Sequence, residues 1–161
     1  MGEPGMADRD RPLTRRGRRD AALMGKAIAA EPPDSILCSP AKRTRETLEE
    51  ILPLLPNKPH VGFIDALYGA PGDYLEAIAD NGEDAKRLLV VGHNPAIHVT
   101  ALLLAGSRET ELREAMAAKF PTATLAVIAF KADTWSTIRP GAGKLASFIR
   151  PRDRGALDAD D

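Results

Sequence analysis

The sequence predicts an α/β domain of three layers, in which a mostly parallel central sheet is flanked by helices. Segments with the periodicity of strands alternate with segments of helical periodicity along the chain. The clearest strand, Arg87–Val91, ends in a continuous apolar run, which is typical of a parallel strand covered on both faces. These two observations favour a layered sheet over an all-helical or all-strand domain.

The first part of the domain is expected to contain two helices around a strand. A helix is predicted at 13–30, where apolar residues recur at helical spacing after Thr14 as N-cap. A short apolar strand follows at 35–38. Ser39-Pro40 then indicates an N-cap with proline in the first turn, and so a second helix at 40–55.

The middle of the chain carries weaker patterns. A strand is expected at 60–64, after a proline-containing turn, and a short helix at 74–79. The apolar strand at 87–91 comes next. A helix at 94–105 is expected to be capped by Asn94-Pro95.

The last part is expected to contain a helix at 109–118 and strands at 125–130, 134–138 and 145–149. The chain has no internal repeat, low-complexity tract or linker, so residues 1–161 are expected to form a single domain.

The composition limits the partners that can be expected. The 22 basic and 23 acidic residues give a net charge of -1, so neither nucleic acid nor a membrane is an expected partner. No apolar run approaches the roughly 20 residues that span a bilayer. The single cysteine, Cys38, suits a reducing compartment, and a cytoplasmic location is expected. Residues 153–161 are expected to form a flexible acidic tail.

Six arginines lie close together near the start of the chain. They fit a solvent-facing side of the first helix, or a surface that attracts a phosphorylated substrate. Nucleic-acid binding has no further support, because aromatic residues are few and do not alternate with the arginines.

Two predicted turns lead from a strand into a helix, at Cys38–Arg43 and Val91–Pro95. In parallel sheets, ligands bind at the carboxyl ends of the strands, and the amide groups of a helix start favour an anion. Arg43 could present two donors to a phosphate group, and His93 could donate a hydrogen bond or exchange a proton. Gly92 would allow a ligand close to the backbone. Each residue could also be purely structural.

These turns resemble two motifs of the histidine phosphatase superfamily. Ser39–Thr47 resembles its Ser-Pro-x-x-Arg-x-x-x-Thr signature, and Val91–Pro95 resembles its second-histidine motif. Further matches, at 10–17, 119–123 and 148–152, are similar to the branch of phosphohistidine phosphatases called SixA-like. The resemblance covers nearly the whole chain.

This resemblance implies a phosphoglycerate mutase-like fold and a set of roles. His93 would be the catalytic second histidine, and Arg43, Ser39, Gly92 and Asn94 would bind phosphate. The reaction would pass through a phosphohistidine intermediate that water hydrolyses, without metal or cofactor. The substrate would be a phosphorylated protein or a small phosphoester.

The nucleophile of this family is a histidine in an Arg-His-Gly or Arg-His-Ala motif that ends the first strand. This sequence has no histidine before His60, and neither His60 nor His98 fits the motif. The first strand also has no counterpart, so we expect the nucleophile upstream of Met1. The alternative is a catalytically silent protein that binds a phosphorylated ligand or phosphoprotein.

Other catalytic classes have less support. Cys38 and Arg43 are one residue too close for the Cys-x-x-x-x-x-Arg loop of cysteine phosphatases. The histidines show no metal-ligand spacing.

The general acid of the predicted phosphatase has three candidates, Asp65, Asp73 and Glu76. They lie where a general acid is found in the wider superfamily, but in no recognisable motif.

Overall fold

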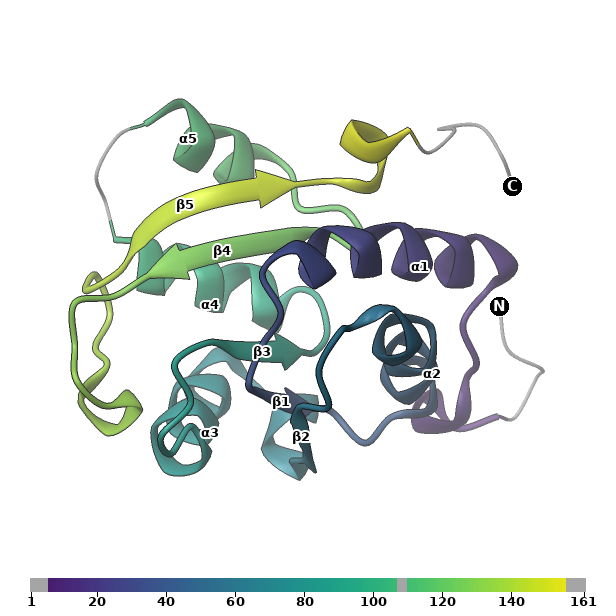
Figure 1. The fold of residues 1–161 in the computed structure, drawn as a ribbon, viewed down its shortest axis with the longest axis horizontal. Helices are drawn as coiled ribbons and strands as arrows, with labels where there is room; N and C mark the ends of the chain where they lie inside the picture. Colours follow the sequence, from purple (N-terminus) through teal and green to yellow (C-terminus); the bar gives the residue numbers. More distant parts are fainter. Residues whose placement is uncertain (1–5, 107–109, 156–161) are drawn as a thin grey trace.

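The computed structural model describes residues 6–106 and 110–155. A three-stranded parallel sheet lies between helices in one half of the molecule (Figure 1). Its strands are β1 (Ser35–Cys38), β2 (His60–Phe63) and β3 (Leu88–Val91), in the order β2-β1-β3. The predicted parallel sheet is therefore confirmed, with β1 as its middle strand.

Two helices cover each face of this sheet. α1 (Arg15–Ala30) and α2 (Lys42–Ile51) pack on one face. α3 (Pro71–Asn81) and α4 (Ala96–Ala105) pack on the other. The three expected layers are present.

The side chains of β1 alternate between these two faces. Ile36 and Cys38, both 0% exposed, pack against side chains of α1 and α2. Leu37 points to the opposite face and packs against Tyr74 and Ala77 of α3. This alternation is the two-residue period of a strand, and an apolar sequence results because both faces are covered.

The late strands form a separate antiparallel sheet. β4 (Leu125–Ala129) pairs with β5 (Lys144–Ile149), and α4 and α5 (Glu111–Ala118) contribute to the core that covers them. The strand predicted at 134–138 is wrong.

Residues Trp135–Thr137 form the 3₁₀ helix η4 instead. The Trp135 indole donates a hydrogen bond of 2.6 Å to the Ala85 carbonyl, and its ring lies against Gly82. Docking of this large ring on the turn after α3 holds the segment away from the second sheet.

β3 and β4 each have one edge that pairs with no strand within residues 6–106 and 110–155. Leu89 and Val91 of β3 and Leu125 of β4 pack against the same core cluster. The two unpaired edges therefore border one region of the molecule.

The helix starts correct two predicted caps. The N-cap of α2 is Ala41 and not Ser39, because the Ser39 amide donates a hydrogen bond to the Val91 carbonyl and so continues the pairing of β1. The N-cap of α4 is Pro95 and not Asn94. The predicted cap Thr14 is confirmed, since its side chain accepts a bond from the third helical residue.

Two predicted helices have different lengths in the structure. α2 ends at Ile51 and continues as the 3₁₀ helix η2 (Leu52–Leu54), whereas α3 begins at Pro71 and is longer than expected.

The acidic tail is predicted at 153–161. Asp153 and Arg154 belong to the 3₁₀ helix η5 (Pro151–Arg154), and residues 156–161 lie outside the described part of the chain. Residue 109 of the helix predicted at 109–118 lies outside it as well.

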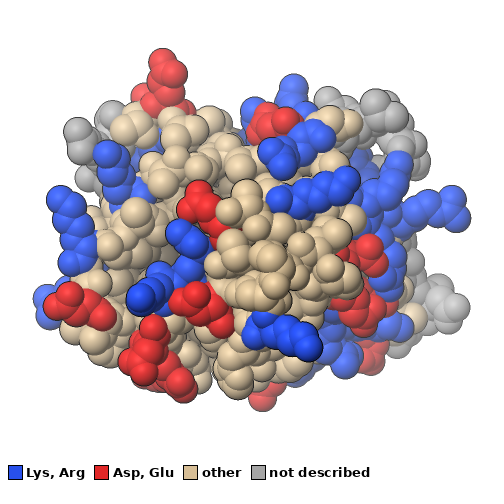
Figure 2. Space-filling model, in the orientation of Figure 1, with Lys and Arg blue, Asp and Glu red and all other residues tan. Residues whose placement is uncertain are grey.

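The arginine cluster does not form a uniform basic surface. Arg18 of α1 reaches α2, where it pairs with Glu46 at 2.8 Å and with Glu50 at 3.0 Å. Glu46 also accepts a bond of 2.7 Å from the Leu13 amide, so it fixes the approach to α1. In Figure 2, basic and acidic side chains alternate over the end of the molecule that α1 and α2 occupy.

None of the helices in the described ranges is both long and apolar enough to span a bilayer.

Replacing Ile36 by alanine is expected to lower the free energy of unfolding by about 2–5 kcal/mol, because a cavity would open between the middle strand and the layer of α1 and α2. Val61→Ala is the matched control, since Val61 lies on the edge strand β2 and is only partly buried. Urea denaturation measures both changes. Equal losses for the two variants would contradict the central position assigned to β1.

Candidate functional site

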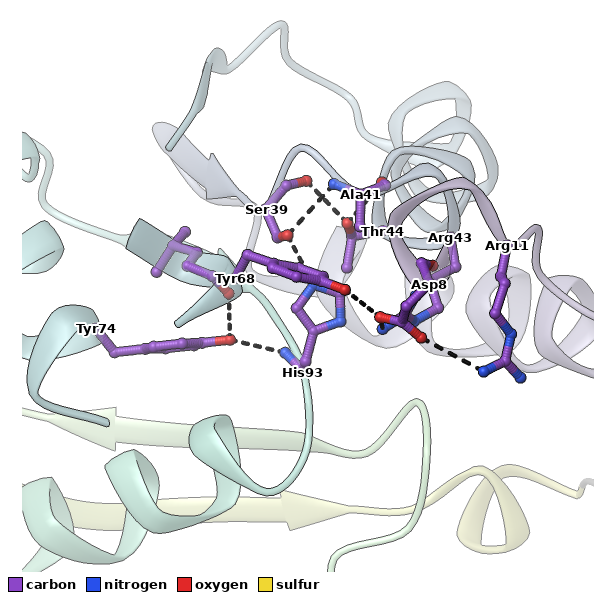
Figure 3. A network of polar contacts seen from close by, with 10 residues as sticks. Asp8, Arg11, Ser39, Ala41, Arg43, Thr44, Tyr68, Tyr74 and His93 are labelled. Carbon is purple, nitrogen blue, oxygen red and sulfur yellow. Dashed lines mark hydrogen bonds and ion pairs between the residues drawn. The ribbon is translucent and has the colours of Figure 1, made fainter. Parts of the chain in front are cut away.

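The two strand-to-helix turns meet at the carboxyl edge of the sheet. β1 and β3 are parallel neighbours, so Ser39 and His93 follow the ends of adjacent strands. The Ser39 amide donates to the Val91 carbonyl at 2.9 Å. The Ser39 hydroxyl lies 2.7 Å from Nε2 of His93 (Figure 3). The register of β1 and β3 thus brings together Ser39 and His93, two of the site residues predicted from the sequence.

Ser39 contacts His93 from a buried position. Its side chain is 0% exposed, and its oxygen accepts a bond of 3.4 Å from the Ala41 amide. A hydroxyl has one hydrogen and two lone pairs, so the Ser39 oxygen can still serve Nε2 of His93 as donor or as acceptor, according to the tautomer of the ring. Thr44 fixes the same turn by donating to the Ser39 carbonyl at 2.8 Å.

Tyr74 of α3 supports the backbone of the second turn. Its hydroxyl accepts a hydrogen bond of 2.8 Å from the His93 amide and donates one of 2.6 Å to the Leu67 carbonyl. A Cβ at Gly92 would overlap the Tyr74 ring. The glycine is therefore required by a tyrosine packed against it, whereas the close approach of a ligand at Gly92 stays a prediction.

Arg43 lies in the first turn of α2 and faces the segment that precedes α1. Its two terminal nitrogens donate to Asp8, at 2.8 Å to the main-chain oxygen and at 3.1 Å to the carboxylate. The same carboxylate oxygen accepts a short hydrogen bond from the Tyr68 hydroxyl. Arg11 approaches the other carboxylate oxygen at 3.4 Å (Figure 3).

Tyr68 joins this charged group to the histidine. It belongs to the 3₁₀ helix η3 (Asp65–Tyr68), and its ring meets the His93 ring edge to face at 5.2 Å. The guanidinium of Arg9 lies 5.1 Å from the Tyr68 ring centroid. Arg43, His93 and Tyr68 therefore border one exposed polar site.

The charges of the site act on the pKa values of its members. Burial, followed by the positive charge of Arg43, lowers the pKa of His93 below its usual 6.5. The hydrogen bond from Tyr68, followed by that from Arg43, lowers the pKa of Asp8. At neutral pH the site thus holds a neutral imidazole, a carboxylate and several guanidinium groups.

Asn94 lies at the margin of this site. Its side-chain amide donates to the Phe120 carbonyl at 3.1 Å and so ties the second turn to the segment before β4. Binding of phosphate by Asn94 stays a prediction.

The other two histidines lie elsewhere. His60 pairs with Ser35 at the amino ends of parallel strands, which is the opposite edge of the sheet. Nε2 of His98 forms a hydrogen bond of 2.7 Å with the Met116 carbonyl, and the His98 ring stacks on the Phe120 ring. Neither histidine reaches the site.

The candidate general acids have different positions. Asp65 is 91% exposed and pairs with Arg9 at 3.6 Å near the site. Asp73 accepts a hydrogen bond of 2.8 Å from the Ala70 amide at the start of α3, which is a structural use of its carboxylate. Nothing in the structure assigns a role to Glu76.

Cys38 is buried in the core beneath the first turn. Its side chain is 0% exposed, and burial raises its pKa to about 12. A thiol of this kind is not a nucleophile at neutral pH.

Within residues 6–106 and 110–155, no group of three or more histidine, cysteine or carboxylate side chains is arranged to hold a metal ion. The expected absence of a metal stays a prediction.

Comparison with known families identifies the chain. The model of the histidine phosphatase superfamily (branch 1) matches residues 6–70, which include Ser39, Arg43 and Tyr68. The chain belongs to the histidine phosphatase superfamily. An uncharacterised protein of Mycobacterium tuberculosis (strain H37Rv) is 39% identical to it over 153 residues, covering 92% of this chain and 94% of that protein.

Solved structures place this superfamily member close to SixA proteins. A candidate phosphohistidine phosphatase SixA of Nakamurella multipartitia superposes with a TM-score of 0.80 at 28% identity, covering 92% of this chain and 90% of that chain. Another, of Agrobacterium tumefaciens, superposes with a TM-score of 0.75 at 28% identity, covering 94% and 91%. The expected fold of the histidine phosphatases is confirmed.

Three members of this site are not predicted from the sequence, namely Asp8, Tyr68 and Tyr74. Asp8 and Tyr68 come from 3₁₀ helices far apart in the sequence, and neither lies in a strand-to-helix turn. Tyr74 had one available signal. A glycine directly before the histidine of a turn can indicate that a large side chain fills the space beside it.

The His93 ring is expected to titrate with a midpoint below its ordinary value of about 6.5, measured by NMR as a function of pH. Arg43→Gln should move the midpoint upward, because one of the two causes of the lowered pKa is removed. In the unfolded chain His93 binds its proton at higher pH, so the stability that it contributes is lost as the pH falls below about 6.5. A midpoint at or above 6.5 in the folded protein would contradict this environment.

The Cys38 thiol is expected to resist alkylation by iodoacetamide in the native protein and to react readily in urea. Mass spectrometry of the modified chain measures both rates. The unfolded chain is the control for intrinsic reactivity. Native modification as fast as that in urea would show that the thiol is neither buried nor protonated.

Proposed function

We propose that this chain forms the phosphoryl-binding pocket of a SixA-like phosphatase, which hydrolyses phosphohistidine or a related phosphoryl group. The observation that carries the proposal is the bonded pair of Ser39 and His93, beside Arg43, at the carboxyl edge of two neighbouring parallel strands. Membership of the superfamily and the similarity to SixA proteins support it. The substrate would be a phosphorylated protein or a small phosphoester.

In this proposal Arg43 and His93 hold the phosphoryl group from two sides. Arg43 presents two donors that match two phosphoryl oxygens. Nε2 of His93 is engaged by Ser39, so the other ring nitrogen, which is directed toward Arg43 and Asp8 in Figure 3, can donate to a third oxygen. These donors would stabilise the negative charge that develops during phosphoryl transfer.

The nucleophile is proposed to come from a segment beyond the described residues. The chain has three histidines, and His60 and His98 lie away from the site. A strand added parallel to the free edge of β3 would end beside His93. The free edge of β4 lies in the same region, so the added strand could pair with β3 along one edge and with β4 along its other edge.

A binding protein without turnover is the second candidate function. It is favoured by the absence of a second histidine from the site within the described residues. Both candidate functions require the pocket to bind phosphate. Only the phosphatase would also turn over a substrate.

The test compares two forms of the protein, residues 1–161 and a form extended by the upstream codons in the same reading frame. Each is assayed with a phosphohistidine peptide and with p-nitrophenyl phosphate. The extended form is expected to turn over substrate, and Arg43→Ala or His93→Ala is expected to lower kcat by about 10²-fold or more, as loss of an oxyanion donor does.

Matched controls are available in the same chain. Arg45→Ala removes an exposed arginine from the same helix, and His60→Ala removes an exposed histidine from the opposite edge of the sheet. Both should leave kcat unchanged. Turnover that survives Arg43→Ala would contradict the phosphatase proposal, whereas phosphate binding without turnover in both forms would establish the binding protein.

A further inference from the structure

The donors expected to hold a phosphoryl group are already occupied by an anion of the chain itself. Asp8 lies in the 3₁₀ helix η1 (Asp8–Asp10), before α1. Both terminal nitrogens of Arg43 are used by this one residue, through its main-chain oxygen at 2.8 Å and its carboxylate at 3.1 Å. Two of the five N–H groups of Arg43 point at Asp8, so a substrate that approaches both terminal nitrogens from this side must first displace Asp8.

The surroundings of the Asp8 carboxylate are those of an oxyanion site. One of its oxygens accepts from both Arg43 and Tyr68, and the other faces Arg11 at 3.4 Å. The three donors come from α2, η3 and the segment before α1. Carboxylates and phosphoryl groups are recognised by the same kinds of donor, so one set can serve both.

We propose that Asp8 is an internal competitor for the phosphoryl group, and that Arg43, Tyr68 and Arg11 form the oxyanion site that it occupies until substrate displaces it. This inference rests on the proposed function of the pocket. It adds Tyr68 and Arg11 as ligands of the substrate and makes η1 a strap over the site.

Movement of the strap would break surface contacts, including those of Arg9 with Asp65 and with the Tyr68 ring, and would leave the core undisturbed. None of the residues of η1 is buried, and the Asp8 side chain is 49% exposed. The Asp8 carboxylate contacts the side chains of Arg43, Tyr68 and Arg11. A phosphoryl dianion carries more charge and more acceptor oxygens than one carboxylate, so it can replace Asp8 at these donors.

Displacement would also change the group next to His93. Tyr68 now donates to Asp8 while its ring lies against the His93 ring at 5.2 Å. With Asp8 removed, the Tyr68 hydroxyl is free to donate to a phosphoryl oxygen near His93. Phosphate can bind only the molecules in which Asp8 has left the site. The apparent Kd for phosphate is therefore the Kd of the open site divided by the fraction of open molecules.

The experiment titrates residues 1–161 with inorganic phosphate and measures Kd by isothermal calorimetry. Asp8→Asn is expected to lower Kd by about 3–10-fold, which corresponds to an open fraction of about 10–30% in the unsubstituted protein. Asp10→Asn is the matched control, since it removes the same charge from the same 3₁₀ helix, and it should leave Kd unchanged. Circular dichroism checks that each variant is folded.

A second variant tests the ligand role of Tyr68. Tyr68→Phe in the Asp8→Asn background is expected to weaken phosphate binding again, because the site loses one donor. If Asp8→Asn binds no more tightly than the unsubstituted protein, or if Asp10→Asn has the same effect, Asp8 is not a competitor. If Asp8→Asn tightens binding but Tyr68→Phe does not weaken it, the oxyanion site does not include Tyr68 and the assignment is wrong.

The outcomes also separate this inference from the function on which it rests. If Arg43→Ala abolishes phosphate binding and Asp8→Asn has no effect on it, the phosphate pocket is supported and the role of Asp8 as a competitor is contradicted. Failure of both the unsubstituted protein and Asp8→Asn to bind phosphate overturns the pocket together with the competitor.

Discussion

The hydrogen bond from the Ser39 amide to the Val91 carbonyl continues the pairing of β1 and β3 by one residue beyond Cys38. The positions of Ser39, His93 and Arg43 in the site depend on this pairing. It places the Ser39 hydroxyl against Nε2 of His93, and it directs α2 so that Arg43 lies beside the same edge. The helices on both faces stabilise the pairing by burying Ile36, Leu37 and Cys38 of β1.

Much of this arrangement could be predicted from the sequence because it is local. The apolar run of β3, the short strand before Ser39 and the helical spacing of α1 each reflect burial of neighbouring residues. The two turns could be predicted to meet, since parallel strands end at one edge. Ser39 and His93 are the part of the site that follows from such reasoning.

The rest of the site depends on contacts between distant segments. Asp8 and Tyr68 are separated by 60 residues, and their hydrogen bond follows from how η1 and η3 are placed around α2. The strand predicted at 134–138 failed for a similar reason, because the docking of Trp135 on the turn after α3 outweighed a local strand pattern. Periodicity carries no information about either contact.

The Tyr74 ring beneath Gly92 has a consequence for how the pocket can be varied. The two positions share one volume, so a side chain at residue 92 would have to be matched by a smaller one at residue 74. A smaller residue there would leave the His93 amide and the Leu67 carbonyl without their shared partner. Libraries that vary the two positions independently would therefore consist mainly of misfolded members, and a pocket of new shape is better sought at the exposed side, around Arg9 and Arg11.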